Sequence, residues 1–387
     1  MTRHLKVLVV HTGLHLREVE SYEIYETVAG LAAAIENEDV VLQATDGRHL
    51  YDAQRGDDGE LEYVRCGSVV DALRRRYDVA HIHMVLPQTH LLLAALLRLR
   101  GVPVVLTPMS MLGDDFGGSS WFRHRRTAVL RVKPHAVRVM RLLWGSVATA
   151  FVVQSEEEAR LAHLPRRRVA LLPLPAPRTP LADAVLDVRP PGGGEDDGPL
   201  AFVSRLDTWR KGLDRLCAWL EAHAEDLPRP AAVLYAPEDG SPRPDSLPRL
   251  IDDGLLRWDK TSRGADLVRE LEAARGVVLL SRWDGQPRVL REAALLGIPT
   301  MSTAASHFTE VVHALGTGVL VSDADDPDEV HRAFGELAGQ PRHADAARRL
   351  FHRDGVGQSL LLLLRQVAAG DPVDVDHYRT FSAVPGV

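Results

Sequence analysis

Short apolar runs recur along the chain, separated by segments whose apolar residues are spaced three and four apart. The runs suit strands buried on both faces of a parallel sheet. Strands are predicted at 5–10, 40–44, 78–85, 104–107, 148–154, 169–174, 199–204, 231–235, 277–280, 298–303 and 319–322. Helices are predicted at 18–36, 90–100, 213–222, 266–273, 287–296 and 329–337. This alternation is typical of βαβ units and predicts an α/β fold with parallel sheets.

The alternation stops near the middle of the chain and then restarts. A proline-rich segment leads there into PPGGGEDDG at 190–198, and 387 residues are too many for one ordinary core. We therefore predict two doubly wound domains and a linker. The predicted parts are a first domain at 1–178, a linker at 179–198, a second domain at 199–345, and C-terminal helices and a tail at 346–387 that pack back towards the first domain.

Two further segments are predicted to lack regular structure. The Asp- and Gly-rich segment 46–60 is predicted to be a surface loop, because such residues favour turns. The tail from Asp371 onward is predicted to be a loosely packed end of the chain.

One stretch of the second half contains the densest set of local signals. An apolar run at 277–280 predicts a buried strand, and a polar turn at 281–285 follows it. Pro287 suits a first helical position, because no N–H is needed there. Gly297 suits the left-handed residue after a helix, and Pro299 prevents its continuation. The stretch therefore predicts strand, turn, helix and strand in this order.

Two carboxylates, Asp284 and Glu292, belong to this turn and helix. In a doubly wound sheet the turns at the carboxyl ends of strands face the ligand crevice, and a helix N-terminus offers N–H donors to an anion. The pair therefore suits a polyhydroxylated ligand that carries phosphate. In the structural alternative, Asp284 is the N-terminal cap of the helix and Glu292 is a solvated helix residue.

Arg205 and Lys211 flank the turn after the first strand of the second half. A cation on each side of such a turn suits a diphosphate. Only four of the 46 Lys and Arg residues are lysines, so a lysine at this position is a distinctive feature. In the alternative interpretation both are solvated surface cations.

His81 and His83 are two residues apart on a predicted strand, so they point to the same side near its carboxyl end. Ligand-facing residues belong there, although a buried, hydrogen-bonded pair or a chance H-x-H is an equal alternative. A metal site needs further ligands at matching spacing, and the sequence shows none. We therefore expect no metal.

The segment 123–141 contains seven Arg or Lys residues and no acid. Such a segment suits peripheral contact with an anionic membrane surface, or a phosphorylated acceptor. The alternative is a solvated helical face that is broken at Pro134.

Composition narrows the class of protein. A hydrophobic content of 45% with 26% charged residues describes a globular chain, and a net charge of −7 argues against a nucleic-acid partner. Two distant cysteines and no signal peptide favour a reducing cytoplasm. The arginine-rich composition is typical of a GC-rich bacterial gene. No pattern indicates an oligomeric state.

Five segments resemble, in order and spacing, the motifs of the retaining glycosyltransferases of GT-B family 4, the glycosyl transferases group 1. They are DVAHIHMV (78–85), VVLTPMSML (104–112), FVSRLDTWRKGLDRL (202–216), SRWDGQPRVLREAALLGIPTMST (281–303) and HFTEVVHALGTGVLV (307–321). The resemblance implies two Rossmann-like domains facing a cleft. It also implies transfer of a sugar from a UDP- or GDP-linked donor to a hydroxyl acceptor, without a metal or another cofactor.

The resemblance assigns roles to individual residues of the second half. Arg205 and Lys211 would hold the donor diphosphate, and Glu292 would bind the nucleotide ribose. Asp284 would contact the sugar hydroxyls at a position where the family usually has Glu. A carboxylate that is one carbon shorter would retune or weaken the choice of sugar.

Backbone groups complete the implied donor site. Gly285 and Gln286 would present N–H groups to the sugar or phosphate. Gly13 is what remains of the family's glycine-rich loop after the first strand. The acceptor implied by the family is a secondary metabolite or a cell-envelope glycan.

The first half departs from the family at a residue that normally lies beside the donor sugar. The family has His where this chain has Met109, and His83 or His81 is the candidate replacement on the acceptor side. In this chemistry the leaving phosphate itself can accept the acceptor proton, so the catalytic set is predicted as Arg205, Lys211, Asp284 and His83. The Met109 substitution leaves two alternatives open: a nucleotide-sugar-binding pseudo-enzyme, and a pseudo-glycosidic coupling enzyme on the same fold.

Overall fold

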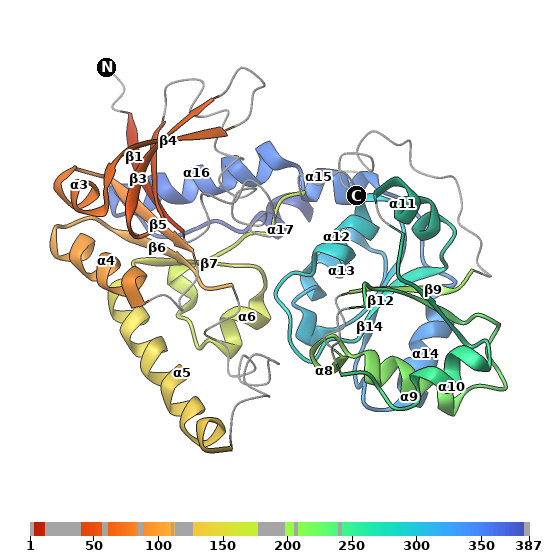
Figure 1. The fold of residues 1–387 in the computed structure, drawn as a ribbon. Coiled ribbons are helices and arrows are strands. Elements are labelled where there is room, and N and C mark those ends of the chain that lie inside the picture. The colour runs from red at the N-terminus through yellow and green to blue at the C-terminus, as the bar shows by residue number, and fades with distance from the viewer. Residues whose placement is uncertain are drawn as a thin grey trace. The chain divides into compact units, whose positions relative to one another are not determined.

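The computed structural model describes residues 4–11, 40–55, 61–83, 88–109, 112, 127–176, 198–204, 208–238, 242–262 and 264–382. The chain forms two compact units (Figure 1). The first combines Met1–Gly117, Thr127–Pro175 and Leu350–Thr380, and the second consists mainly of Ala176–Arg349. The predicted helix 18–36 and nearly all of the predicted linker 179–198 lie outside the described residues, as do Gly13 and Arg205.

The first unit is built on a sheet of eight described strands in the order β4-β3-β2-β1-β5-β6-β7-β8. The strands are β1 Leu5–Val10, β2 Val40–Thr45, β3 His49–Arg55, β4 Leu61–Ser68, β5 Val79–His83, β6 Val104–Thr107, β7 Ala150–Val153 and β8 Val169–Leu171. All neighbours pair in parallel except β2 with β3 and β3 with β4. The predicted parallel sheet is therefore present, with an antiparallel hairpin at one edge.

Helices pack on this sheet. They are α3 Val69–Arg74, α4 Gln88–Leu99, α5 Thr127–Val147, α6 Glu156–Leu161, the 3-10 turn η3 Arg166–Arg168, α16 Arg353–Ala369 and α17 His377–Ser382. Ser155 is the N-cap of α6, because its hydroxyl accepts the Glu158 N–H at 2.9 Å.

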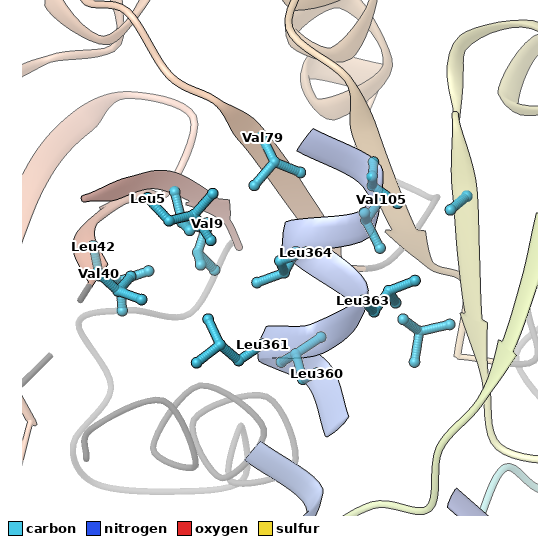
Figure 2. Close-up of a cluster of buried hydrophobic side chains, with 14 of the residues drawn as sticks. Leu5, Val9, Val40, Leu42, Val79, Val105, Leu360, Leu361, Leu363 and Leu364 are labelled. Atoms are coloured by element: carbon cyan, nitrogen blue, oxygen red, sulfur yellow. The ribbon is translucent and has the colours of Figure 1, made fainter. Parts of the chain in front are cut away.

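The C-terminal helix α16 supplies a large part of the core of the first unit. Its Leu360, Leu361, Leu363 and Leu364 pack against apolar residues of the central strands (Figure 2). The residues from those strands include Leu5, Val9, Val40, Leu42, Val79 and Val105. Burying a leucine side chain contributes about 1.5–3 kcal/mol. The last helices of the chain are therefore integral to the fold of the first unit.

The second unit has a six-stranded parallel sheet in the order β11-β10-β9-β12-β13-β14. Its strands are β9 Leu200–Val203, β10 Ala232–Tyr235, β11 Leu256–Asp259, β12 Gly276–Leu279, β13 Thr300–Thr303 and β14 Val319–Val321. Its helices are α8 Thr208–Lys211, α9 Leu213–Ala222, α10 Leu247–Asp252, α11 Gly264–Glu272, α12 Arg288–Leu295, η4 Ala304–Ser306, α13 Thr309–Leu315, α14 Pro327–Leu337 and α15 Asp345–Leu350.

Three sequence predictions are wrong. The first is the surface loop at 46–60, because residues 49–55 form β3. A β-bulge between Leu50 and Tyr51 lets both of these consecutive side chains be buried. The bulge interrupts the strict alternation by which a strand is recognised.

The second wrong prediction is the break at Pro134, because α5 continues through this residue. A proline inside a helix costs about 3 kcal/mol. Burial of Val137 and Trp144 in the following turns offsets that cost, since each large apolar side chain contributes about 1.5–3 kcal/mol.

The third is the loosely packed tail from Asp371. Val375 and Tyr378 are buried, and the Tyr378 hydroxyl donates to the Gln154 carbonyl at 2.9 Å. Tertiary contacts that local sequence does not reveal therefore order this part of the chain up to α17.

Candidate active site

The order of the strands defines where a ligand is expected in the second unit. From β9 the chain moves outward through β10 and β11, then returns to the other side of β9 through β12, β13 and β14. The carboxyl ends of β9 and β12 thus border a topological switch point, the usual ligand crevice of a doubly wound sheet. The segments that follow these two strands contain Lys211, Asp284 and Glu292.

A close main-chain approach positions Lys211. Gly212 separates α8 from α9 with a left-handed φ of 77°. A Cβ atom on Gly212 would lie 2.1 Å from the carbonyl oxygen of Leu280, just after β12. Only glycine fits this contact, so the Lys-Gly dipeptide brings the lysine to the end of the neighbouring strand.

Lys211 forms an ion pair with Asp284, its Nζ donating to Oδ2. The two side chains are 15% and 13% exposed, so the pair is shielded from water although not fully buried. The Asp284 N–H donates to the Ala305 carbonyl at 3.0 Å, which fixes the turn against η4. The structural alternative for Asp284 is wrong, because the N-cap of α12 is Pro287.

Glu292 lies on α12 and is 4% exposed, so it is not the solvated helix residue of the structural alternative. Its Oε1 is 3.7 Å from the Nε of Arg288, one turn earlier. The N-cap residue Pro287 provides no side-chain hydrogen bond to the first turn of α12, and that turn contains no acid. The first-turn N–H groups and Arg288 together favour an anion at this helix end. Gln286, just before the helix, is buried.

Arg282 holds the two sequence-distant turns together, a role that no spacing rule identified. Its Nη1 donates to the Trp209 carbonyl and to Asp214 Oδ1, each at 2.8 Å, and its Nη2 donates to Asp325 at 2.9 Å. The Arg282 N–H also donates to the Arg210 carbonyl at 2.9 Å. One planar guanidinium therefore fixes the α8 turn beside the turn after β12.

A second carboxylate contact strengthens this support. Arg215 donates to both oxygens of Asp325, at 2.8 and 2.6 Å, and to the Leu280 carbonyl at 3.0 Å. The hydrogen bond from Arg215 lowers the pKa of the Asp325 carboxyl below its ordinary value. The carboxylate therefore stays charged and holds both arginines.

In the first unit the corresponding switch point lies between β1 and β5, and histidines gather there. The predicted same-side arrangement is confirmed: the rings of His81 and His83 are 4.1 Å apart, and His11 is 6.2 Å from His83. His81 Nε2 lies 2.8 Å from the Thr107 hydroxyl. Burial lowers the pKa of His81 to about 3 and that of His11 to about 4, so both rings are neutral at pH 7.

His83 is buried as well, and burial lowers its pKa well below the ordinary value. Both histidines are therefore buried, as in the structural alternative, and the hydrogen bond to Thr107 is made by His81. A neutral imidazole can still donate to or accept from a sugar hydroxyl. His11 was not singled out from the sequence, because only the parallel pairing of β1 with β5 brings it beside the other two rings.

Met109 follows β6 in the first unit and has a left-handed φ of 53°. The Gln154 amide Nε2 lies 3.3 Å from its sulfur atom. A left-handed conformation costs a non-glycine residue about 1–2 kcal/mol, and such strain concentrates at functional sites. A thioether cannot donate a hydrogen bond to a sugar, unlike the histidine expected from the family pattern.

Within the described residues no group of three or more His, Cys, Asp or Glu side chains could hold a metal ion. In the same part of the chain no helix is long and apolar enough to cross a membrane.

Two family profiles match the chain. A profile described as glycosyl transferase 4-like domain matches residues 27–175, and one described as glycosyl transferases group 1 matches residues 198–340. The chain is a family 4 glycosyltransferase. The motifs quoted from both halves of the sequence therefore belong to the family that they resemble. No curated protein sequence matches this glycosyltransferase.

Solved structures confirm the GT-B fold of this glycosyltransferase. Sucrose-phosphate synthase from Thermosynechococcus elongatus matches with a TM-score of 0.61 and 17% identity, over 95% of this chain and 100% of that one. A glycosyltransferase of avilamycin A biosynthesis matches with a TM-score of 0.55 and 18% identity, over 96% and 100%. HepE of Anabaena in complex with UDP matches with a TM-score of 0.55 and 14% identity, over 94% and 100%.

Proposed function

We propose that this glycosyltransferase moves a sugar from a UDP- or GDP-linked donor to a hydroxyl acceptor with retention of anomeric configuration and without a metal ion. The observation that carries the proposal is the Lys211–Asp284 pair at the switch point of the second unit. Buried Glu292 and the uncapped N-terminus of α12 follow the same strand as Asp284. A cation, two carboxylates and the first-turn N–H donors of α12 suit a diphosphate that links a ribose to a hexose.

Each residue has a chemical task in this proposal. Lys211 has three N–H donors, so it can keep its contact with Asp284 and also bind a phosphate oxygen. Asp284 accepts from the sugar hydroxyls, and Glu292 accepts from the ribose hydroxyls. Arg205, which lies outside the described residues, is the second cation for the diphosphate.

The reaction breaks the bond between the anomeric carbon and the β-phosphate oxygen, and forms a bond from that carbon to the acceptor oxygen on the same face. The acceptor proton passes to the departing phosphate oxygen, so atoms and charge balance without a metal or a protein base. Lys211 and the N–H groups of α12 stabilise the negative charge that develops on the diphosphate. Removing one such donor typically costs about 3–4 kcal/mol of transition-state stabilisation.

On the acceptor side we propose that the neutral rings of His81 and His83 hold hydroxyl groups, in place of the family histidine that Met109 replaces. Neutral rings suit this task, because they provide one donor and one acceptor each without charge. The acceptor class that we propose is a secondary metabolite or a cell-envelope glycan. The structure of a glycosyltransferase of avilamycin A biosynthesis, a secondary-metabolite pathway, shares the fold.

We further propose that the reaction takes place in the cytoplasm. Cys66 and Cys217 are both free thiols, and the Cys217 thiol is buried. Unpaired cysteines are common where glutathione and thioredoxin keep thiols reduced.

The site is tested by comparing Lys211→Ala, Asp284→Asn and Glu292→Gln with the parent chain in a nucleotide-release assay with UDP- and GDP-sugars. The matched controls are Lys260→Ala and Glu238→Gln, which break a second lysine–carboxylate ion pair of the same unit, with a 2.7 Å contact. We expect kcat/KM to fall at least 100-fold in the first set and less than twofold in the controls. Equal activity in both sets would exclude the site assignment.

Product analysis separates the proposal from the two alternatives left open by Met109. The proposed enzyme yields a glycoside with the donor's anomeric configuration, as read from the anomeric proton coupling. A coupling enzyme yields a product in which the acceptor joins an atom other than a sugar carbon. A pseudo-enzyme binds the nucleotide-sugar, seen as a raised Tm, and releases no sugar with any acceptor.

A further inference from the structure

Large apolar side chains are exposed on α4 and α5, although surface helices of globular proteins usually expose polar faces. Leu92 and Leu99 of α4 are 63% and 84% exposed, and Leu142 of α5 is 74% exposed. Val139 and Leu143 are also exposed, and together with Leu142 they follow the i, i+3, i+4 spacing of one helix face. The two helices pack side by side in the first unit (Figure 1).

Apolar side chains this exposed on two adjoining helices indicate an interaction surface. Single exposed leucines are ordinary, whereas a contiguous apolar patch marks an interaction surface. The structure provides an internal comparison, because the other face of α5 buries Val137 and Trp144. The helix is therefore apolar on two faces, and only one of them is used by the fold.

Charge identifies the kind of partner. Between Asp78 and Glu156 the sequence contains nine Arg or Lys residues and only two acids, in a chain whose net charge is −7. Arg98 and Arg100 are exposed at the end of α4, and Arg138 is exposed on α5. Burial lowers the pKa of the Arg168 guanidinium below its ordinary value, and repulsion from Arg167 and Arg98 adds to this shift. Among the described residues, three exposed arginines therefore lie on or next to the two helices that carry the exposed leucines.

We propose that the exposed face of α4 and α5 is a peripheral docking surface for a membrane that contains anionic phospholipids. Leucines that enter the acyl boundary and arginines that contact phosphate are the combination by which amphipathic helices bind such interfaces. A second copy of the chain fits less well, because a twofold contact through this surface would bring like charges together. The proposal depends on no step of the proposed glycosyl transfer.

The surface differs from the one that the basic segment 123–141 suggested. Part of that segment lies outside the described residues, and Arg141 is occupied within the fold, donating to the Leu112 carbonyl at 2.8 Å. The docking surface is instead centred on the C-terminal half of α5 and includes α4, which the charge pattern alone did not indicate.

The test is sedimentation of the full chain with vesicles of phosphatidylcholine alone, or with 30 mol% phosphatidylglycerol added. Two double variants remove the two parts of the surface: Leu99→Ser with Leu142→Ser, and Arg98→Glu with Arg138→Glu. The matched controls are Leu362→Ser and Arg365→Glu, which change an exposed leucine and an exposed arginine of α16 in the same unit. All substituted positions are exposed, so folding is preserved and circular dichroism checks it.

We expect the parent chain and both controls to sediment with the anionic vesicles and to be released by high salt. Each arginine near the surface contributes about fivefold to binding, so the Arg98→Glu, Arg138→Glu variant should bind at least about 25-fold more weakly. The Leu99→Ser, Leu142→Ser variant should bind at least about tenfold more weakly than the parent chain. The proposal would be overturned if the parent chain did not sediment with the anionic vesicles, or if both double variants bound them as tightly as the parent chain. A dimer in sedimentation velocity that Leu142→Ser dissociates would overturn it in favour of self-association.

Discussion

The substitution Gly212→Ala tests whether a main-chain contact positions Lys211, the lysine of the proposed donor site. Gly212 has a φ of 77°, and an added Cβ would meet the Leu280 carbonyl oxygen at 2.1 Å. Real Cβ atoms essentially never approach a neighbouring atom within 3.0 Å, and both partners here are main chain. The turn that carries Lys211 therefore has to move away from β12.

The matched control is Gly254→Ala, at a residue of the same unit with a φ of 72° and no atom within 4 Å of the added Cβ. The left-handed conformation costs alanine about 1–2 kcal/mol, and the stiffer unfolded chain returns about 0.4–1 kcal/mol. The control should therefore lose about 1 kcal/mol. Overpacking adds about 1–3 kcal/mol, so Gly212→Ala should lose about 2–4 kcal/mol.

Scanning calorimetry and transfer kinetics measure the two consequences. A difference of about 2 kcal/mol corresponds to about 4–8 °C in the Tm of a unit of this size. We expect the transition of Gly212→Ala to lie that far below that of Gly254→Ala, and kcat/KM to fall at least tenfold in Gly212→Ala only. Equal Tm values and equal kcat/KM for the two variants would refute the role of the close approach.

The remaining predictions concern the support of the site and the buried histidines. Arg282→Ala should lower kcat/KM about 10- to 100-fold, because the turn that contains Lys211 loses its anchor. Arg282→Lys should restore stability more than turnover. The control is Arg249→Ala, which removes an exposed ion pair, and a loss of kcat/KM in Arg282→Ala no larger than in this control would contradict the prediction. Because burial lowers the pKa of His11 to about 4 and that of His81 to about 3, the unfolded chain binds protons below pH 6.5 that the folded chain does not. The free energy of unfolding should therefore decrease as the pH is lowered, by about 2 kcal/mol per histidine between pH 7 and pH 5. The substitution His11→Asn should make this decrease smaller. A stability that is constant between pH 7 and 5 in urea titrations would exclude this effect.

Local chemistry made many elements of this chain predictable. The strands 5–10 and 104–107 and the helix 213–222 were predicted with the bounds of β1, β6 and α9. The positive φ of Gly297 after α12 was also expected. Apolar runs, caps and left-handed glycines act within a few residues, so their signals lie in the sequence around them.

The candidate site was only partly predictable, for a physical reason. The motifs identified Lys211, Asp284 and Glu292, but not the direct contact between the first two, which are 73 residues apart. Arg282 and Gly212 contact main-chain atoms of turns that are distant in the sequence. The spacing of apolar and polar residues around each position does not indicate such a contact. His11 joins the histidine group only through strand pairing.

By itself, then, the sequence determined the alternation of strands and helices, the division into two parallel sheets and the family motifs at the ends of strands. The tertiary structure alone decided that residues 49–55 form β3, that α5 continues through Pro134, and that the second apolar face of α5 stays exposed. Periodicity shows how much apolar surface a segment has, because it depends on neighbours in the chain. Which of that surface is buried depends on neighbours in space, and only the folded chain determines those.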